Sequence, residues 1–186
     1  MRRTPEERAL LKLAERVLPQ GSLGNLRLDD DYAFVVRRGL GSRIWDVSGN
    51  EYIDFLLGSG PMLIGHCHPD VMAAVHEQLP RGTTFFANNE HGILLAEEIV
   101  KAVACADKVR FTSSGSEATF YAMRVARTHH KRDKILKFEG GFHGMNDYAL
   151  MSMAPAQPLD FPMATPDSAG IPESVGAELL IAPFND

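Results

Sequence analysis

The sequence has little of several features that would point to particular classes of protein. Only two of its 186 residues are cysteines, Cys67 and Cys105, and their spacing fits no disulfide framework, which indicates a reducing compartment. The net charge of -5 provides no broad basic field for nucleic acid. No apolar run is long enough to span a bilayer, and acidic residues interrupt the first twenty positions, unlike a signal peptide. We therefore expect a cytoplasmic protein without a nucleic-acid or membrane partner.

Three well-known site motifs are also missing, namely the P-loop, the dinucleotide fingerprint GxGxxG and the nucleophile elbow GxSxG. The stretch FTSSGSEAT instead places hydroxyls and a glycine between a strand-like run and a helix-forming run. Backbone N–H groups at a helix start can bind an anion, so Ser114, Gly115 and Ser116 could hold a phosphate. The same residues fit a capping box, in which Ser114 caps the helix and Glu117 reaches back. The window alone leaves both interpretations open.

The pattern of apolar and helix-breaking residues predicts a mixture of helices and strands. Thr4 is expected to cap a first helix that opens at Pro5, with Glu7 closing a capping box. The order strand, helix, strand after residue 108 implies parallel neighbours and a right-handed crossover, as in an α/β fold. Five prolines between 151 and 174 predict a long loop or a linker. The other elements are expected as strands at 32–36, 43–47, 51–55, 108–111, 134–138 and 178–181, and helices at 69–79, 89–103 and 116–130.

A second glycine-flanked motif, KFEGGFHGMND, follows the strand expected at 134–138. Ligands of an open parallel sheet lie beyond the carboxyl ends of its strands. Both motifs are therefore expected at the same edge, where one offers a phosphate cradle and the other offers the flat ring of Phe142. A phosphorylated planar aromatic cofactor would satisfy both.

Together, SSGSEAT and RDKILKFEGGFHG resemble the class III aminotransferases, which use pyridoxal phosphate. The resemblance extends through WDVSGNEYIDF, GPMLIGHCHPDV, RGTTF and LIAPFND, and covers the chain from about residue 18 onward. Within that class, the sequence is most similar to the glutamate-semialdehyde aminomutase branch and its aminotransferase relatives. The resemblance implies the N-terminal part of an α/β, fold-type I pyridoxal-phosphate-dependent transferase. Residues 1–60 would form the N-terminal arm and small-domain segment, and 61–186 the first, truncated part of the large parallel-sheet domain.

The resemblance also implies roles for individual residues. Gly115 and Ser116 match the phosphate-binding pair of the family, with Ser114 just before them. Phe142 matches the aromatic residue that stacks on the pyridine ring of pyridoxal 5′-phosphate, and His143 follows at the edge of the cofactor.

Two further positions bear on the substrate. Arg27 falls where the aminomutase branch has an arginine facing the substrate carboxylate, or it is a surface arginine. Ser59 stands where aminomutases usually carry a tryptophan. This departure favours an aminotransferase that acts on a different amino acid or amino aldehyde, with the aminomutase activity as the alternative.

The sequence offers no catalytic residue of its own. The Schiff-base lysine of the family is expected beyond Asp186, and Lys137 is a poor substitute because a lysine at a strand end is usually solvated or paired. His66-Cys67-His68 lacks the further ligands of a metal site, so no metal is expected. The full-length form is expected to be a homodimer acting on a small-molecule amino substrate. The alternative from another class is a non-catalytic truncated fragment or a split subunit.

Overall fold

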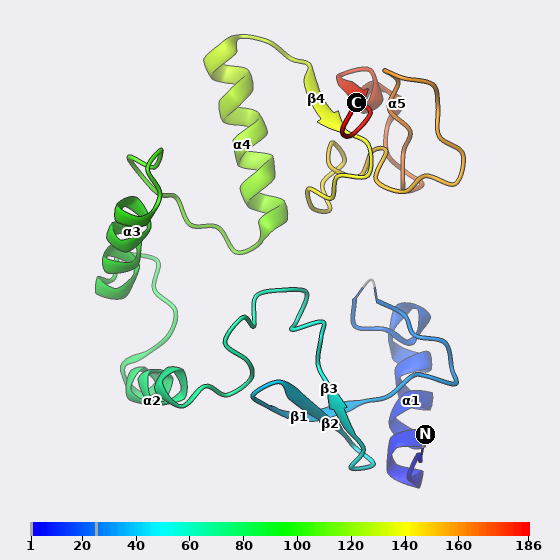
Figure 1. Ribbon diagram of the computed structural model, residues 1–186, viewed down its shortest axis with the longest axis vertical. Coiled ribbons are helices and arrows are strands. Elements are labelled where there is room, and N and C mark those ends of the chain that lie inside the picture. Colours follow the sequence, from blue (N-terminus) through cyan, green and yellow to red (C-terminus); the bar gives the residue numbers. More distant parts are fainter. Residues whose placement is uncertain (1, 25) are drawn as a thin grey trace. The chain divides into compact units, whose positions relative to one another are not determined.

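The computed structural model describes residues 2–24 and 26–186. The chain divides into two compact units, one ending at Ala87 and the other beginning at Asn88, and each is described by itself (Figure 1). The domain boundary expected after residue 60 refers to the domains of the longer family fold and stays a prediction.

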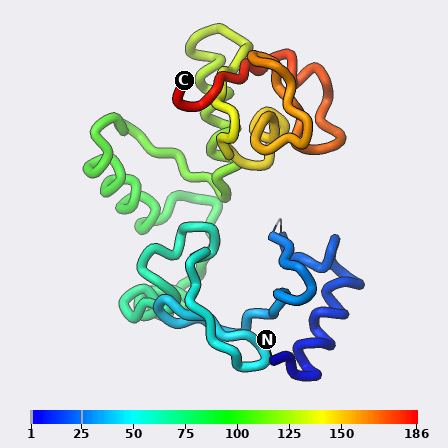
Figure 2. Tube along the Cα trace, turned by 45° about the vertical axis from the view of Figure 1, so that its right-hand side comes forward, coloured from blue at the N-terminus to red at the C-terminus, as the bar shows by residue number. Residues whose placement is uncertain are grey.

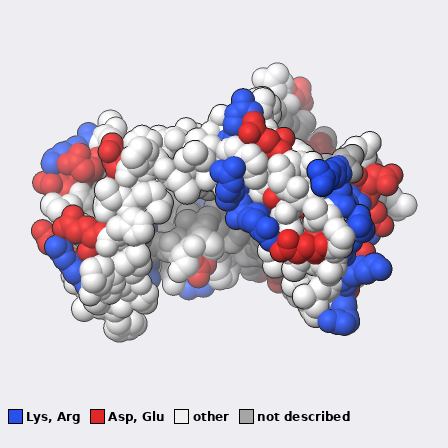
Figure 3. All heavy atoms as spheres, turned by 90° about the horizontal axis from the view of Figure 1, so that it is seen from below, with Lys and Arg blue, Asp and Glu red and all other residues white. Residues whose placement is uncertain are grey.

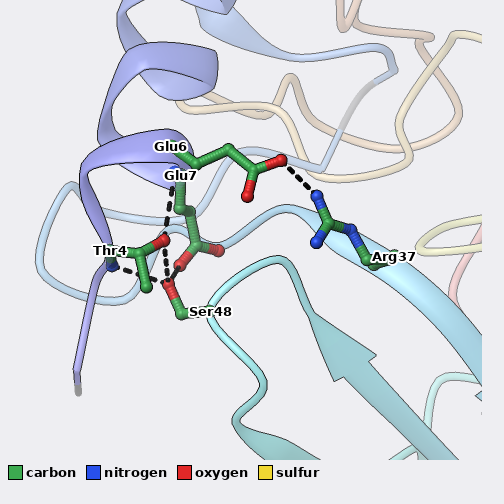
Figure 4. Close-up of polar contacts among 5 residues, drawn as sticks. All are labelled: Thr4, Glu6, Glu7, Arg37 and Ser48. Carbon is green, nitrogen blue, oxygen red and sulfur yellow. Dashed lines mark hydrogen bonds and ion pairs between the residues drawn. The ribbon is translucent and has the colours of Figure 1, made fainter.

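The first helix, α1 (Pro5–Val17), begins as its sequence predicts. Thr4 caps it by accepting a hydrogen bond from the Glu7 amide at 3.4 Å. Glu7 does not close the expected capping box, because the Thr4 amide already donates to the Ser48 hydroxyl at 2.8 Å. The fully buried Glu7 carboxylate instead accepts from the Ser48 hydroxyl (Figure 4) and from the Val35 amide, the latter at 2.8 Å. The glutamate therefore joins α1 to the neighbouring sheet.

That sheet has three antiparallel strands in the order β1 (Val36–Leu40), β2 (Arg43–Asp46) and β3 (Glu51–Ile53). The hairpin between β2 and β3 confirms the sequence prediction. The strand expected at 32–36 is wrong, because β1 begins at the end of that range. The amide of Tyr32 donates to the carbonyl of Asp29 at 2.8 Å, so this segment forms a turn and cannot join the ladder.

A buried carboxylate stabilises the β2–β3 turn. Asp46 accepts hydrogen bonds from the backbone amide of Asn50 at 2.8 Å, from its side-chain amide at 2.7 Å, and from the Tyr52 hydroxyl at 2.7 Å. Burial by itself would raise the pKa of Asp46, but these hydrogen bonds outweigh burial and lower it from 3.8. Burial and the bond to Asp46 raise the pKa of Tyr52 to about 12.

Two more helices follow their predicted ranges. In the first unit, α2 (Pro69–Gln78) has proline at its first position, where the missing N–H costs nothing. In the second unit, α3 (Glu90–Ala102) is capped by Asn89, whose side-chain oxygen accepts from the Gly92 amide at 2.9 Å. Both helix starts were therefore readable from the sequence.

The second unit contains α4 (Gly115–His130), β4 (Ile135–Phe138), the short α5 (Glu173–Gly176) and β5 (Leu179–Ala182). The parallel pairing expected between the strands at 108–111 and 134–138 is wrong, because β4 pairs in parallel with β5 instead, with Ile135 opposite Leu179. The strand expected at 108–111 is wrong. A strand needs a neighbour for its ladder, and in the described chain β4 is paired with β5 alone.

The connection from β4 to β5 is long and irregular, as the prolines predicted, and Figure 2 shows its winding path in yellow through red. The Ser152 amide donates to the Thr165 carbonyl at 2.7 Å, so the connection folds back on itself. It supplies part of a small core, which consists of Met151, Ala164, Leu179 and Ile181. This core covers one face of the β4–β5 pair.

Charge is mixed along the surface. On the face shown in Figure 3, basic and acidic side chains are interspersed, and neither sign forms a continuous field. Within the described residues, no helix combines the length and the apolar character needed to cross a bilayer.

Candidate cofactor-binding site

The beginning of α4 is a capped helix end with free backbone donors. The Ser114 hydroxyl accepts from the Glu117 amide at 3.2 Å, and the Glu117 carboxylate accepts from the Ser113 amide at 2.7 Å. The predicted Ser114 cap is therefore present, and Glu117 reaches back as expected, but to the amide of the residue before the cap. Because the Ala118 amide makes the first bond of the helix, to the Ser114 carbonyl, the N–H groups of residues 115 and 116 lie ahead of it. These groups are the donors that an anion at this end would meet.

The space in front of Gly115 is open. Apart from its chain neighbours and the backbone of its own helix, a Cβ built at this position would have no heavy atom within 4 Å, and the residue is not in the left-handed region. Neither the backbone conformation nor the packing of the protein therefore requires glycine here. What glycine provides is room for another group to approach the helix end.

The turn that follows β4 lies directly against this helix end. The Met145 amide donates to the Ser116 hydroxyl at 2.9 Å, and the Asn146 side-chain amide donates to the Ser116 carbonyl at 3.3 Å. The Thr119 hydroxyl donates to the His143 carbonyl at 2.6 Å. Gly144, with a φ of +104°, packs so closely that a Cβ would lie 2.6 Å from the Ser116 Cα. The structure thus brings the two glycine-containing motifs together.

The aromatic side chains of this turn differ in orientation. Phe142 is 62% exposed, so its side chain is accessible to a ligand. The ring of His143 folds back over Gly141, with Nε2 2.8 Å from the position that a Cβ of Gly141 would occupy. Phe142 therefore presents an open apolar surface, whereas the ring of the exposed His143 lies over Gly141.

Two residues of this corner were not found by sequence reasoning. Thr119 lies one helical turn after Gly115, so its i+4 spacing on the same face could have indicated it. Asn146 had no signal beyond being a polar residue in a turn, and its contact with Ser116 is decided by the tertiary fold.

The two positions expected to bear on substrate both belong to the first unit. Arg27 is exposed in the segment between α1 and β1. Ser59 is exposed in a glycine-rich loop and adopts a left-handed backbone conformation, with a φ of +67°.

The lysine considered as a substitute for the Schiff-base residue is not solvated. Lys137 is buried on β4, and its Nζ donates to the carbonyls of Ala149, at 3.0 Å, and of Met151. Burial lowers the pKa of this ammonium group from its ordinary value of 10.5. Its contacts show that Lys137 holds the start of the long connection in place.

No metal centre accompanies the site. Across residues 2–24 and 26–186, no three histidine, cysteine, aspartate or glutamate side chains are grouped as a metal ion would require. His66, which belongs to the His66-Cys67-His68 stretch considered as a metal site, instead forms a hydrogen bond with Asp54, with 2.7 Å between Nε2 and Oδ2.

Comparisons with known proteins identify the family of this chain. Residues 27–175 match the model of the family described as aminotransferase class-III. A glutamate-1-semialdehyde 2,1-aminomutase of Methanothermobacter thermautotrophicus is 44% identical over 176 residues, which are 95% of this chain and 41% of that protein. This chain thus spans about 41% of the length of that relative.

Solved structures give the same result. An omega-transaminase from Sphaerobacter thermophilus is similar with a TM-score of 0.90 and 37% identity, over 97% of this chain and 42% of that one. A structure described as a transaminase with PLP bound has a TM-score of 0.90 and 33% identity, over 100% of this chain and 43% of that one. The matched ranges and identities establish that this chain belongs to the class-III aminotransferase family.

Proposed function

We propose that this chain forms part of an enzyme that transfers amino groups with pyridoxal 5′-phosphate, and that it supplies the phosphate cradle and one ring contact of the cofactor. The observation that carries the proposal is the juxtaposition of the open start of α4 with the turn bearing the exposed ring of Phe142.

The residues present fit the phosphate group. The N–H groups of Gly115 and Ser116 lie at a helix end whose dipole favours a negative charge, and the open space at Gly115 lets a phosphate oxygen approach. The hydroxyls of Ser114 and Ser116 already accept one bond each from the protein, and each retains an O–H donor. Charge-assisted bonds of this kind are about twice as strong as neutral ones.

When bound, the cofactor withdraws electrons from the α-carbon of an amino substrate. The residues of this chain would bind the cofactor and orient it. The α4 end would fix the phosphate, Phe142 would lie against the ring, and the Thr119–His143 bond would hold the turn that carries Phe142 in place. We assign no catalytic residue to this chain, since Lys137, considered above as a substitute for the Schiff-base lysine, is committed to backbone carbonyls.

The substrate is proposed as a small amino acid or amino aldehyde, with Arg27 and Ser59 as its contacts. The relatives carry both activities in their names, since one is an aminomutase and the other an omega-transaminase. The serine at position 59 favours an aminotransferase, and glutamate-semialdehyde aminomutase activity is the alternative. A homodimer of the full-length form and a cytoplasmic location complete the proposal, and the free, exposed Cys67 and Cys105 support a reducing compartment.

Titration of the purified chain with pyridoxal 5′-phosphate, and with pyridoxal as the matched ligand without phosphate, tests the cradle. We expect the phosphate ester to bind at least tenfold more tightly, because the charged group makes the strongest contacts. Equal affinity for the two ligands would contradict the proposal. A chain that binds the cofactor but transfers no amino group from a donor to a keto acid would be the non-catalytic fragment or split subunit.

A further inference from the structure

A loop in the first unit is closed at its base by a side-chain bond. The loop comprises residues 55–65, and the residues flanking it are Asp54 and His66. The Nε2 atom of His66 lies 2.7 Å from the Oδ2 atom of Asp54. The loop therefore begins and ends at one contact, although eleven residues separate its two ends.

His66 is fixed independently of that bond. Its backbone pairs with Gly41, N–H to carbonyl in both directions, at 2.8 and 2.9 Å. Its ring packs on Gly39, where a Cβ would lie 2.6 Å from the ring carbon Cγ. Gly39 of β1 thus leaves the space that the His66 ring fills, and the pairing with Gly41 holds the His66 backbone.

Asp54 connects the His66 ring to the backbone of the loop. While Oδ2 faces His66, Oδ1 accepts from the amides of Leu56 and Leu57, both at 2.9 Å. The Asp54 amide donates to the Ser42 carbonyl at 2.8 Å, which ties the residue to the hairpin. The hydrogen bond from His66 is the main reason that the pKa of Asp54 is lowered from 3.8, so the acceptor stays ionised.

The segment that Asp54 leads into has an unusual backbone. Leu57, Gly58, Ser59 and Gly60 have consecutive positive φ values of 51°, 63°, 67° and 109°. Residues with a Cβ pay for this conformation and keep it only where their surroundings impose it. The carboxylate of Asp54, bonded to the amide of Leu57, is the constraint at the entrance of the run.

We propose that Asp54 and His66 are a positioning pair for substrate recognition. Their bond holds the left-handed run in one conformation, and the run presents Ser59 to the amino substrate. Neither residue of the pair touches the substrate; each acts through the loop. The inference rests on the proposed amino-transfer function, in which Ser59 is a substrate contact.

Two variants of His66 separate the bond from the packing. His66→Phe keeps a flat ring on Gly39 and removes the donor, whereas His66→Gln restores an N–H donor at the position of Nε2. Amide hydrogen exchange of residues 55–65 is measured in the full 186-residue chain. We expect exchange about tenfold faster in His66→Phe and close to wild type in His66→Gln, with α1 amides unchanged in both. Unchanged loop exchange in His66→Phe would overturn the proposal.

The second measurement is a kinetic assay of amino transfer, made on the full-length form of the protein. We expect His66→Phe to raise KM for the amino donor about tenfold with kcat within about twofold, and His66→Gln to restore KM. Faster loop exchange with unchanged KM would refute the role in recognition. The affinity for pyridoxal 5′-phosphate is measured in parallel. If the wild-type protein does not bind pyridoxal 5′-phosphate, the proposed function is refuted. The hydrogen-exchange data would still test whether the Asp54–His66 bond holds the loop.

Discussion

Replacement of Gly115 by alanine tests whether the glycine is required for folding or for binding of the cofactor. The added methyl group meets no heavy atom within 4 Å, and the backbone is outside the left-handed region. The position is the first residue of α4, where alanine suits a helix at least as well as glycine does. The free energy of unfolding should therefore stay the same or rise by up to about 1 kcal/mol.

The substitution should instead lower the affinity for the phosphate group of the cofactor. The methyl group would occupy the open space at Gly115, through which the proposed phosphate oxygen would approach the N–H groups of Gly115 and Ser116. Loss of one hydrogen bond to a charged group costs about 1.5–3 kcal/mol. This corresponds to affinity for pyridoxal 5′-phosphate that is roughly ten- to a hundredfold weaker.

The assay pairs equilibrium binding of pyridoxal 5′-phosphate with urea unfolding of the free protein. Gly24→Ala is the matched control, because a Cβ at Gly24 also meets nothing within 4 Å, and Gly24 lies outside the proposed site. The reasoning fails if Gly115→Ala binds the cofactor as tightly as wild type, or if Gly24→Ala weakens binding equally. Loss of stability in Gly115→Ala would show instead that the glycine serves the fold.

Three further predictions concern single side chains. Asp46, whose pKa is lowered from 3.8, contributes stability that is present above that pH and lost as the pH falls below it. The Asp46→Asn variant should therefore have a lower free energy of unfolding than wild type near neutral pH, and should lose less of it on acidification. Urea unfolding at a series of pH values measures both effects. Phe142→Leu removes an exposed ring and should weaken binding of pyridoxal 5′-phosphate by about 0.5–1.5 kcal/mol without changing stability, whereas a loss of stability would place the ring in the core. Borohydride reduction with one equivalent of pyridoxal 5′-phosphate should leave Lys137 unmodified in peptide mass spectra, because its Nζ is buried against two carbonyls; an adduct there would contradict that arrangement.

The sequence alone determined the local elements whose signals are short-range. Thr4 and Asn89 accept hydrogen bonds from amides three residues ahead, so the starts of α1 and α3 were predictable. The cap by Ser114 was predictable for the same reason. The resemblance of several motifs, in the same order, to those of the class III aminotransferases also indicated the family.

Only the tertiary structure decided where distant partners meet. The carboxylate of Glu7 turns away from its own helix end because Val35 and Ser48 supply donors from the neighbouring sheet. The strand expected at 108–111 gains no ladder, since extended sequence becomes a strand only beside a hydrogen-bonding neighbour. The contact of Asn146 with Ser116 depends in the same way on chain segments brought together by the fold. Such contacts depend on closure of long loops, and no local periodicity encodes them.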